Sequence, residues 1–469
     1  MTETHELTGG SWRELLGPKN IGASTVLAGG VALYATNEFL TISLLPSAVA
    51  EIGGHRYYAW VVTVYLVASV AGATLVSSQL ARFGPRSAYL GALAVFGVGS
   101  AICALAPAME ALLVGRVVQG GAGGLLAGLG YAVINTALPR SLWTRASALV
   151  SAMWGLGIFL GPAVGGLFAQ FGSWRWAFAA LVVLTVAIAA LVPIALPARS
   201  GAREVVAIRV PVRSLLLLGS AALVVSVAGV AQHAVLTAIL LATAAGLVAV
   251  FLAVERRTAE AGAATGTPVL PPTVFRPGPL KWIYLTLGAL MAATMVVMYV
   301  PLFGQNLAGL APAAAGLLGV ALAIGWTVSE IVSASVDRRA VVTRIVCVAP
   351  IVMAVGLGAC ALLVRDAMPA WLTVVWGLAM VAAGLGVGMA WPHLSAWAMI
   401  RVQDPAEGPV AAAAINTVQL ICGAFGAGVA GVVVNTVTTG DADAARWLFG
   451  GFSVLIALGA IASFRAGHR

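Results

Sequence analysis

The stretch Gly155–Gly166 reads GLGIFLGPAVGG and lies inside a long apolar run. In the helix of a soluble protein each interior glycine costs about 1 kcal/mol, and an interior proline costs about 3 kcal/mol. In a membrane, small residues let a neighbouring helix approach closely, and packed helices satisfy the backbone groups that proline frees. The stretch therefore predicts a transmembrane helix in close contact with its neighbours. The alternative is a Gly/Ala helix that is merely well packed.

Composition extends this prediction to the whole chain. Hydrophobic residues make up 61% of the 469 residues, charged residues make up 9%, and the mean hydropathy is +1.01. Apolar runs of 18 or more residues indicate membrane-spanning helices, and the short alternating segments of transmembrane strands are not seen in the sequence. We expect an all-α integral membrane protein with about fourteen spans. Hydropathy places them near residues 21–49, 57–79, 87–106, 109–138, 146–169, 176–196, 214–231, 234–254, 282–303, 313–334, 345–364, 369–398, 409–437 and 447–464.

The net charge of +9 reflects membrane topology. Twenty of the 25 Lys and Arg residues fall on the side of the predicted spans that carries both termini, four fall on the opposite side, and Arg116 falls within a span. Because positive residues favour cytoplasmic loops, we expect both termini in the cytoplasm and no nucleic-acid partner. Arginine outnumbers lysine 23 to 2, which is typical of a GC-rich bacterial genome. The expected location is the cytoplasmic (inner) membrane of a bacterium, which the chain crosses many times.

Two polar stretches divide the predicted spans into groups of six, two and six. Residues 1–20 form a cytoplasmic N-terminal segment, and residues 21–197 form an N-terminal six-helix bundle. Residues 198–281 hold basic loops and a two-helix spacer, and Glu255 to Lys281 is expected to be a flexible linker. Residues 282–469 form the C-terminal six-helix bundle. Paired bundles of this kind bind substrate between them and rock to open on alternate sides.

Glu38 is one of two acidic residues expected deep inside a span. Holding a charge at bilayer depth costs on the order of several kcal/mol, so such a residue normally faces a cavity or titrates. Tyr34, Glu38 and Thr41 share one helix face, with Asn37 beside them. Because burial disfavours the charged form of a carboxyl, Glu38 is a candidate proton carrier. The alternative is a carboxylate held by structural hydrogen bonds.

Arg116 is the basic residue committed to a span interior, and Glu330 is the second deep acid. A guanidinium keeps its charge and needs a carboxylate, carbonyl groups or water as a partner. We expect Glu38 to be that partner, because a nearby guanidinium favours the charged carboxylate while burial opposes it. The alternative is an arginine that reaches to the interface. Glu330, with Trp326 one turn earlier, binds a cationic substrate, carries a proton or is a structural acid.

Aromatic and polar side chains within the spans suit a broad apolar pocket with few polar anchors. Many of them will instead be core or interfacial residues, and a lone His393 is often just hydrogen-bonded. The candidate substrate-binding residues are Tyr34, Asn37, Thr41, Tyr299, Gln305, Trp326, Trp391, His393, Asn416 and Gln419. The sequence contains no nucleotide-binding loop, catalytic triad or metal-ligand spacing, so we expect neither an enzyme nor a metal site. The four cysteines fall in apolar spans and are expected to be buried hydrophobes.

Several motifs resemble the major facilitator superfamily. Gly155–Gly166 follows the G-x-G-x3-G-P-x2-G-G pattern of the fifth helix of its proton-driven antiporters. Leu113–Gly123 resembles the fourth-helix motif, whose arginine is implicated in proton coupling, and this implies that role for Arg116. Trp174–Phe178 resembles the entry to the sixth helix in drug:proton antiporters. The residues of the antiporter motif are Gly155, Gly157, Gly161, Pro162, Gly165 and Gly166.

Other segments give a mixed likeness. Tyr299, Pro301 and Gln305 resemble the first span of the later half in fourteen-span drug antiporters, whereas Thr36–Phe39 resembles a pattern from certain twelve-span efflux proteins. The loop after the second span departs from the family, because residue 81 is alanine where the family has an aspartate used in a cytoplasmic gate. The resemblance implies gating roles for the charged residues of this loop and its counterpart in the later half, which are Arg82, Arg86, Asp337 and Arg338.

The resemblance implies two bundles plus two spacer helices that form a proton-coupled antiporter exporting small amphipathic compounds by alternating access. The proton gradient would be its energy source, with no cofactor. Its partners would be protons, the lipid bilayer and the substrate, and the chain would be a monomer. One alternative is a narrow-specificity exporter of a lipid, siderophore or metabolite, or a proton symporter. Another is a transport-inactive sensor or scaffold on the same fold.

Overall fold

The computed structural model describes residues 11–197, 211–231, 233–261, 268–336, 338–404 and 407–467. Over these ranges the chain is helical and has no strand. The first part contains α1 (Trp12–Leu15), α2 (Ile21–Ile52), η1 (His55–Tyr57), α3 (Trp60–Thr74), α4 (Val76–Ala104), α5 (Met109–Ala132), α6 (Ile134–Ala137), η2 (Arg140–Leu142), α7 (Trp143–Phe171), α8 (Trp174–Ala195), α9 (Val212–Val230) and α10 (Ala234–Ala261). The second part contains η4 (Pro272–Phe275), α11 (Leu280–Thr294), η5 (Met295–Tyr299), α12 (Val300–Ala308), α13 (Pro312–Gly319), α14 (Ala321–Ala334), α15 (Arg339–Leu363), α16 (Ala370–Ile400), α17 (Gly408–Thr436) and α18 (Asp441–Gly467).

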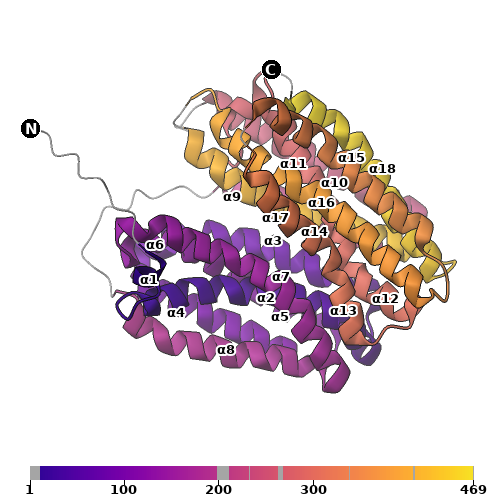
Figure 1. Cartoon of the computed structure of the whole chain (residues 1–469), viewed down its shortest axis with the longest axis horizontal. Coiled ribbons are helices and arrows are strands. Elements are labelled where there is room, and N and C mark those ends of the chain that lie inside the picture. The colour runs from indigo at the N-terminus through magenta and orange to yellow at the C-terminus, as the bar shows by residue number, and fades with distance from the viewer. Residues whose placement is uncertain are drawn as a thin grey trace, which may run out of the picture.

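The long helices form two groups with the same packing pattern (Figure 1). In the first half, α2 packs against α5, α7 and α8, while α4 packs against α5 and α8, and α3 against α5. In the second half, α11 packs against α16, α17 and α18, while α15 packs against α16 and α18, and α14 against α16. Each contact of one half therefore has a counterpart in the other, as internal repeats of a transporter fold require.

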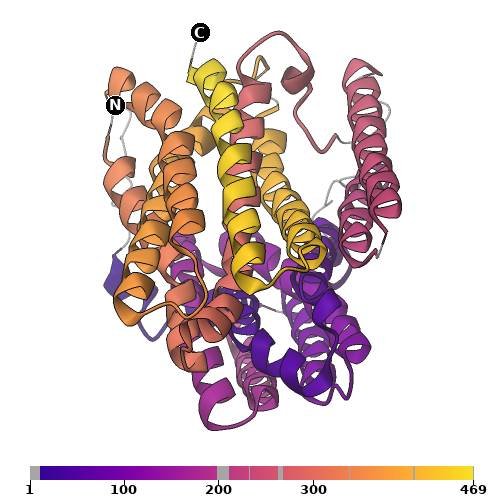
Figure 2. The same cartoon turned by 90° about the vertical axis from the view of Figure 1, so that its right-hand side faces the viewer.

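The spacer helices α9 and α10 stand at the edge of the molecule (Figure 2). Helix α9 packs against α3 of the first half and α17 of the second, and α10 packs on α9. The spacer therefore touches both halves through α9, while most of the α10 surface is left to the bilayer.

The prediction of a flexible linker from Glu255 is wrong for its first residues. Helix α10 continues to Ala261, and Glu255 within it is only 1% exposed. Its carboxylate accepts hydrogen bonds from the backbone N–H groups of Val269 and Leu270, at 2.8 and 2.9 Å, and from Ser214 Oγ at 2.5 Å. A buried carboxylate is tolerated when donors surround it, and here those donors hold the following segment against the spacer.

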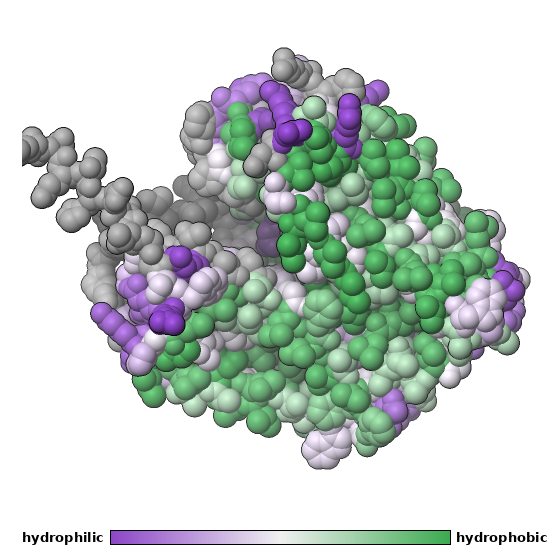
Figure 3. All heavy atoms as spheres, viewed as in Figure 1, coloured by the Kyte–Doolittle hydropathy of each residue, from purple (hydrophilic) through white to green (hydrophobic). Residues whose placement is uncertain are grey.

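Thirteen helices of the described chain are long and apolar enough to cross a membrane. Helix α2 is 32 residues long but is not among them, because polar residues such as Asn37 and Glu38 lower its hydropathy. With α2 the number equals the fourteen expected. Figure 3 shows a broad apolar surface over both halves, which fits a protein surrounded by lipid. The prediction of an all-α membrane protein is confirmed.

Several predicted spans are broken in the structure. Helix α3 ends at Thr74 and α4 begins at Val76, so the loop expected after the second span is largely helical, with a kink at Gly84. Gly84 has φ 76° and ψ 170°, a conformation that favours glycine. The span expected at 282–303 consists of α11, η5 and α12, and Pro301 lies in the first turn of α12, where its missing N–H costs nothing.

The two halves separate at one end of the molecule and meet at the other. In Figure 1 the two halves diverge toward the side on which α1 and α6 lie, and the surface is hollowed between the two lobes on that side (Figure 3). At the opposite end, Tyr58 Oη donates to the carbonyl of Met298 at 3.2 Å, and its ring stacks on Tyr299 with centroids 4.9 Å apart. Asn435 Nδ2 donates to the carbonyl of Arg56 at 2.9 Å. These contacts close the end opposite the hollow.

Glycines of α7 set how closely it approaches α2. A Cβ on Gly161 would lie 2.7 Å from Phe39 Cβ and 2.8 Å from the Leu40 nitrogen, so no side chain fits there. Gly157 and Gly165, one turn away on either side, are equally tight against α2. This spacing of small residues brings two backbones together.

The end of α7 also meets the second half. A Cβ on Gly166 would lie 2.7 Å from the Cα of Ala313 in α13. Ser43 Oγ of α2 donates to the carbonyl of Pro162 at 3.0 Å, and Gly316 of α13 lies directly against this pair. Helices α2, α7 and α13 therefore meet at one point near the closed end.

We expect Gly161→Leu to destabilise the protein, because overpacking a tight contact typically costs about 1–3 kcal/mol. Gly155→Leu is the matched control, since nothing lies within 4 Å of a Cβ at that position. The measurement is thermal unfolding of each purified variant in detergent. Equal melting temperatures for the two variants would show that α2 and α7 are not tightly packed at Gly161.

Candidate functional site

A cluster of buried polar residues joins α2 and α5 inside the first half. Asn37 and Arg116 are fully buried and Glu38 is 5% exposed. Arg116 lies one turn before Gln119 on α5, which is also fully buried. Polar groups at bilayer depth must find partners within the protein. This cluster therefore either holds the helices together or forms a site for a proton or substrate.

The Nε and Nη1 groups of the Arg116 guanidinium donate to neutral acceptors. Its Nε donates to the carbonyl of Val61 at 3.1 Å, and its Nη1 donates to Asn37 Oδ1 at 3.2 Å and Gln119 Oε1 at 3.0 Å. The guanidinium carbon lies 3.9 Å from the centre of the Tyr65 ring, a cation–π contact. Arg116 is therefore held inside the bundle and does not reach to an interface.

The prediction that Glu38 is the ion-pair partner of Arg116 is wrong. The three ion pairs among the described residues are Glu51–Arg175, Arg256–Glu260 and Asp443–Arg446. Asn37 takes the place expected for Glu38. The two residues are neighbours on α2 and point about 100° apart around the helix axis, and Asn37 is the one that accepts from Arg116.

Glu38 is left with an unsatisfied oxygen. Its Oε2 is buried and has no hydrogen-bond partner, and the same holds for the nearby Tyr34 hydroxyl and for Asn37 Nδ2. Thr41 Oγ1 is occupied, since it donates to the Asn37 carbonyl at 2.7 Å. Unpaired buried polar atoms are rare and call for an explanation.

Sequence reasoning missed several members of this cluster. Tyr65 stacks on Tyr34, with centroids 5.5 Å apart, and donates to the Tyr34 carbonyl at 3.1 Å. Gln119 Nε2 donates to Ser100 Oγ at 2.9 Å, which extends the network to α4. Gln119 lies within the segment that resembles the fourth-helix motif, but no sequence spacing relates Tyr65 or Ser100 to Arg116.

A second cluster lies in the other half and contains four of the predicted residues. Trp326 Nε1 donates to Glu330 Oε2 at 2.9 Å, and the Trp326 and Trp391 rings lie 5.4 Å apart. His393 Nε2 shares a 2.9 Å hydrogen bond with Ser333, which the sequence did not indicate. Glu330 Oε2 thus has a donor, unlike Glu38 Oε2.

The orientation of α14 places this second cluster away from lipid. Ile324, Val328 and Ile331 are 40%, 53% and 69% exposed and form one face of α14. Trp326 and Glu330 lie on a different face and are half-buried. They are therefore turned away from the exposed apolar face of α14.

The other predicted binding residues are dispersed. Tyr299 is fully buried at the closed end, where it stacks on Tyr58. Gln305 is half-buried and its Nε2 has no partner. On α17, Asn416 is exposed and Gln419 is half-buried. The structure does not bring these four into one cluster.

The residues expected to gate are only partly described, since Asp337 lies outside the described residues. Arg82 is exposed and stacks on the adjacent Phe83 ring at 5.1 Å. Arg86 Nε donates to the carbonyl of Leu196 at 3.1 Å, a contact within the first half. Arg338 is the exposed N-cap of α15.

The Trp174–Phe178 segment fixes the start of α8 to the end of α2. Trp174 Nε1 donates to Glu51 Oε2 at 2.7 Å, and Arg175 forms an ion pair with the other oxygen of Glu51. Arg175 also donates to the carbonyl of Ala106 at 2.8 Å. This motif therefore has a structural explanation.

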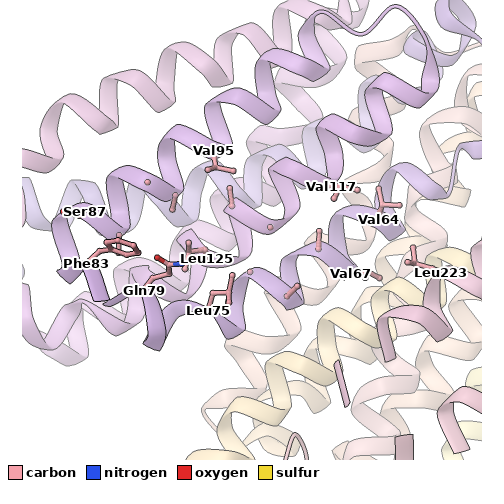
Figure 4. A pocket seen from close by; sticks show the side chains of 18 of the residues that line it. Val64, Val67, Leu75, Gln79, Phe83, Ser87, Val95, Val117, Leu125 and Leu223 are labelled. Carbon is pink, nitrogen blue, oxygen red and sulfur yellow. The ribbon is translucent and has the colours of Figure 1, made fainter. Parts of the chain in front are cut away.

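A cavity of about 930 Å³ lies between α3, α4 and α5 and reaches α9 at Leu223 (Figure 4). Its walls are apolar, with Gln79, Phe83 and Ser87 grouped at one end. Neither Glu38 nor Arg116 lines it. It is therefore a separate feature from the polar clusters.

Comparison with known proteins gives concordant results. The family model described as Major Facilitator Superfamily matches residues 27–427. A Mycobacterium tuberculosis protein named "Probable multidrug-efflux transporter" is 58% identical over 474 residues, covering 100% of this chain and 99% of that protein. An inward-facing, occupied bacterial homolog of the human lysosomal transporter Spinster matches with a TM-score of 0.66 and 12% identity over 97% of both chains. A D-xylose–proton symporter matches with a TM-score of 0.62 and 17% identity, covering 94% of this chain and 96% of that one.

We expect Asn37→Ala to lower the melting temperature in detergent, because a hydrogen bond to a charged group is worth about 1.5–3 kcal/mol. Glu38→Gln is the matched control on the same helix, and it should leave the melting temperature unchanged because no hydrogen bond to Glu38 Oε2 is lost. The opposite result, a stable Asn37→Ala and an unstable Glu38→Gln, would make Glu38 the anchor of Arg116.

Proposed function

The chain belongs to the major facilitator superfamily, and we propose that it exports small amphipathic compounds in exchange for protons. It is a multi-pass membrane transporter and not an enzyme. Support for export of drug-like compounds comes from the name of the 58% identical relative and from the antiporter motif in α7. The proposed location is the bacterial inner membrane with both termini in the cytoplasm, as the distribution of Lys and Arg favours.

The observation that carries proton coupling is the buried, unpartnered Oε2 of Glu38. A protonated carboxyl is the form that fits a site without an ion partner, because a bare charge there is costly. Arg116 lies in the same cluster and favours the charged form when the proton leaves. Glu38 can then exist in both states, which a proton carrier requires, and Arg116 acts as its modulator.

Transport follows from alternation between two conformations, one open to each side of the membrane. In the conformation described, the hollow opens on the side of α1 and α6, which we place in the cytoplasm (Figure 3). A substrate enters from that side, and proton release from Glu38 accompanies its binding. Separation of Tyr58 from Tyr299 and of α7 from α13 would open the opposite side, where the substrate leaves and Glu38 takes up a proton.

The residues of the second cluster indicate the chemical class of the substrate. Trp326 and Trp391 offer aromatic faces, and Glu330 offers a carboxylate whose only described donor is Trp326. Aromatic faces with one acid attract organic cations. We propose that this cluster holds the positive end of a cationic amphiphile in the space between the halves.

The test of proton coupling uses proteoliposomes with a trapped pH-sensitive dye and a panel of cationic, neutral and anionic amphiphiles. Addition of a substrate should move protons in the wild type. Glu38→Gln should fold, bind and yet move no more protons than protein-free liposomes. Glu110→Gln removes an exposed acid at the start of α5 and should behave as the wild type. Unchanged proton movement in Glu38→Gln would exclude Glu38 as the coupling residue.

The test of the substrate class compares cationic with neutral compounds. Glu330→Gln should reduce efflux of cationic amphiphiles about tenfold, the equivalent of about 1.4 kcal/mol of lost binding, and should leave neutral ones unchanged. Efflux is measured from loaded vesicles under an imposed proton gradient. Equal losses for both classes would assign Glu330 to coupling or to structure and would contradict the cation assignment.

A further inference from the structure

Four positive residues meet at one corner of the second half. Lys281 lies at the start of α11, Arg339 begins α15, Arg401 follows α16, and Arg465 lies in the last turn of α18. We call these four residues the basic corner. They come from four different helices, so the packing of the fold brings them together.

Aromatic rings hold these cations in place. The Arg465 guanidinium carbon lies 4.6 Å from the centre of the Trp282 ring, and Lys281 Nζ lies 5.5 Å from the same ring. The Arg401 guanidinium carbon lies 4.1 Å from the Trp397 ring. Side chains fixed on a ring lose little further freedom when they bind a ligand, so the corner is preorganised.

Contacts link Lys281, Arg465 and Arg401, and the charge of Arg339 acts on Arg401. Arg401 Nη1 donates at 2.7 Å to the carbonyl of Ala466, the residue after Arg465. Burial and then the like charge of Arg339 lower the pKa of Arg401. The like charges of the corner repel one another, and none of the four forms an ion pair with a carboxylate of the described residues. A bound anion would relieve this repulsion.

The corner lies at the edge of the lipid-facing surface. Leu285, one turn after Lys281 on α11, is 55% exposed, and Ile461, one turn before Arg465 on α18, is 56% exposed. Apolar side chains that are this exposed on membrane helices face acyl chains. One turn further along each helix, the cations are at the depth of lipid headgroups.

We propose that the basic corner binds the phosphate of an anionic phospholipid, with the acyl chains along Leu285 and Ile461. Guanidinium groups bind phosphate through paired, charge-assisted hydrogen bonds, and Arg465 and Lys281 supply donors beside Trp282. A zwitterionic lipid carries its own positive group and gains less from four cations, so the corner selects a negative headgroup.

The experiment is a titration of delipidated protein with phosphatidylglycerol or phosphatidylethanolamine, followed by native mass spectrometry. Wild type should bind phosphatidylglycerol at least fivefold more tightly than phosphatidylethanolamine. The double variant Lys281→Gln/Arg465→Gln should lose that preference. The control Arg213→Gln/Arg257→Gln removes two exposed cations from the spacer helices and should keep it. Arg401 is not substituted, because its guanidinium donates to the carbonyl of Ala466 in the last turn of α18.

Three results would overturn the proposal. The double variant could melt like the wild type and keep the preference, or the control could lose it equally. Inorganic phosphate at equal concentration could displace the lipid completely, which would reveal a site for free phosphate. Should the double variant fail to fold, Lys281→Gln alone should weaken the preference without unfolding the protein, since among the described residues Lys281 interacts with the Trp282 ring.

Discussion

A guanidinium without access to water is the strongest constraint on the first half. Arg116 is fully buried and cannot shed its charge, so the surrounding helices must supply acceptors. The carbonyl of Val61, Asn37 and Gln119 meet this need from α3, α2 and α5. The relative rotation of these three helices is thereby tied to one side chain, and Glu38 is placed by the same rotation.

The neutral acceptors around Arg116 have a consequence for Glu38. An ion pair would hold the carboxylate charged and would oppose protonation, which suits a structural site better than a proton carrier. With Asn37 as the acceptor, the positive charge stays in the cluster while Glu38 keeps a buried oxygen without a donor. The carboxyl can then change its protonation state without breaking the contacts that hold α2 against α5.

The sequence predicted the helices well and their partners poorly, for physical reasons. Apolar run length and glycine spacing are local properties, so the spans and the tight face around Gly161 were predictable. Which of Asn37 and Glu38 reaches Arg116 depends on how α2 rotates against α5, which no spacing within one helix reveals. Glu255 was taken for the start of a linker because its charge ended an apolar run, yet Val269 and Leu270 supply donors from beyond that run.

Helix α2 connects the two parts of the proposed cycle. Its middle carries Glu38, and its later turns carry Phe39, Leu40 and Ser43, which contact Gly161 and Pro162 of α7. Helix α7 in turn contacts Ala313 of α13 in the other half. Because these contacts have no room for a side chain between the backbones, α2 cannot shift without moving α7 and the closed end. A change at Glu38 that favours one position of α2 therefore favours one state of the contact between the halves, which is the coupling that an antiporter needs.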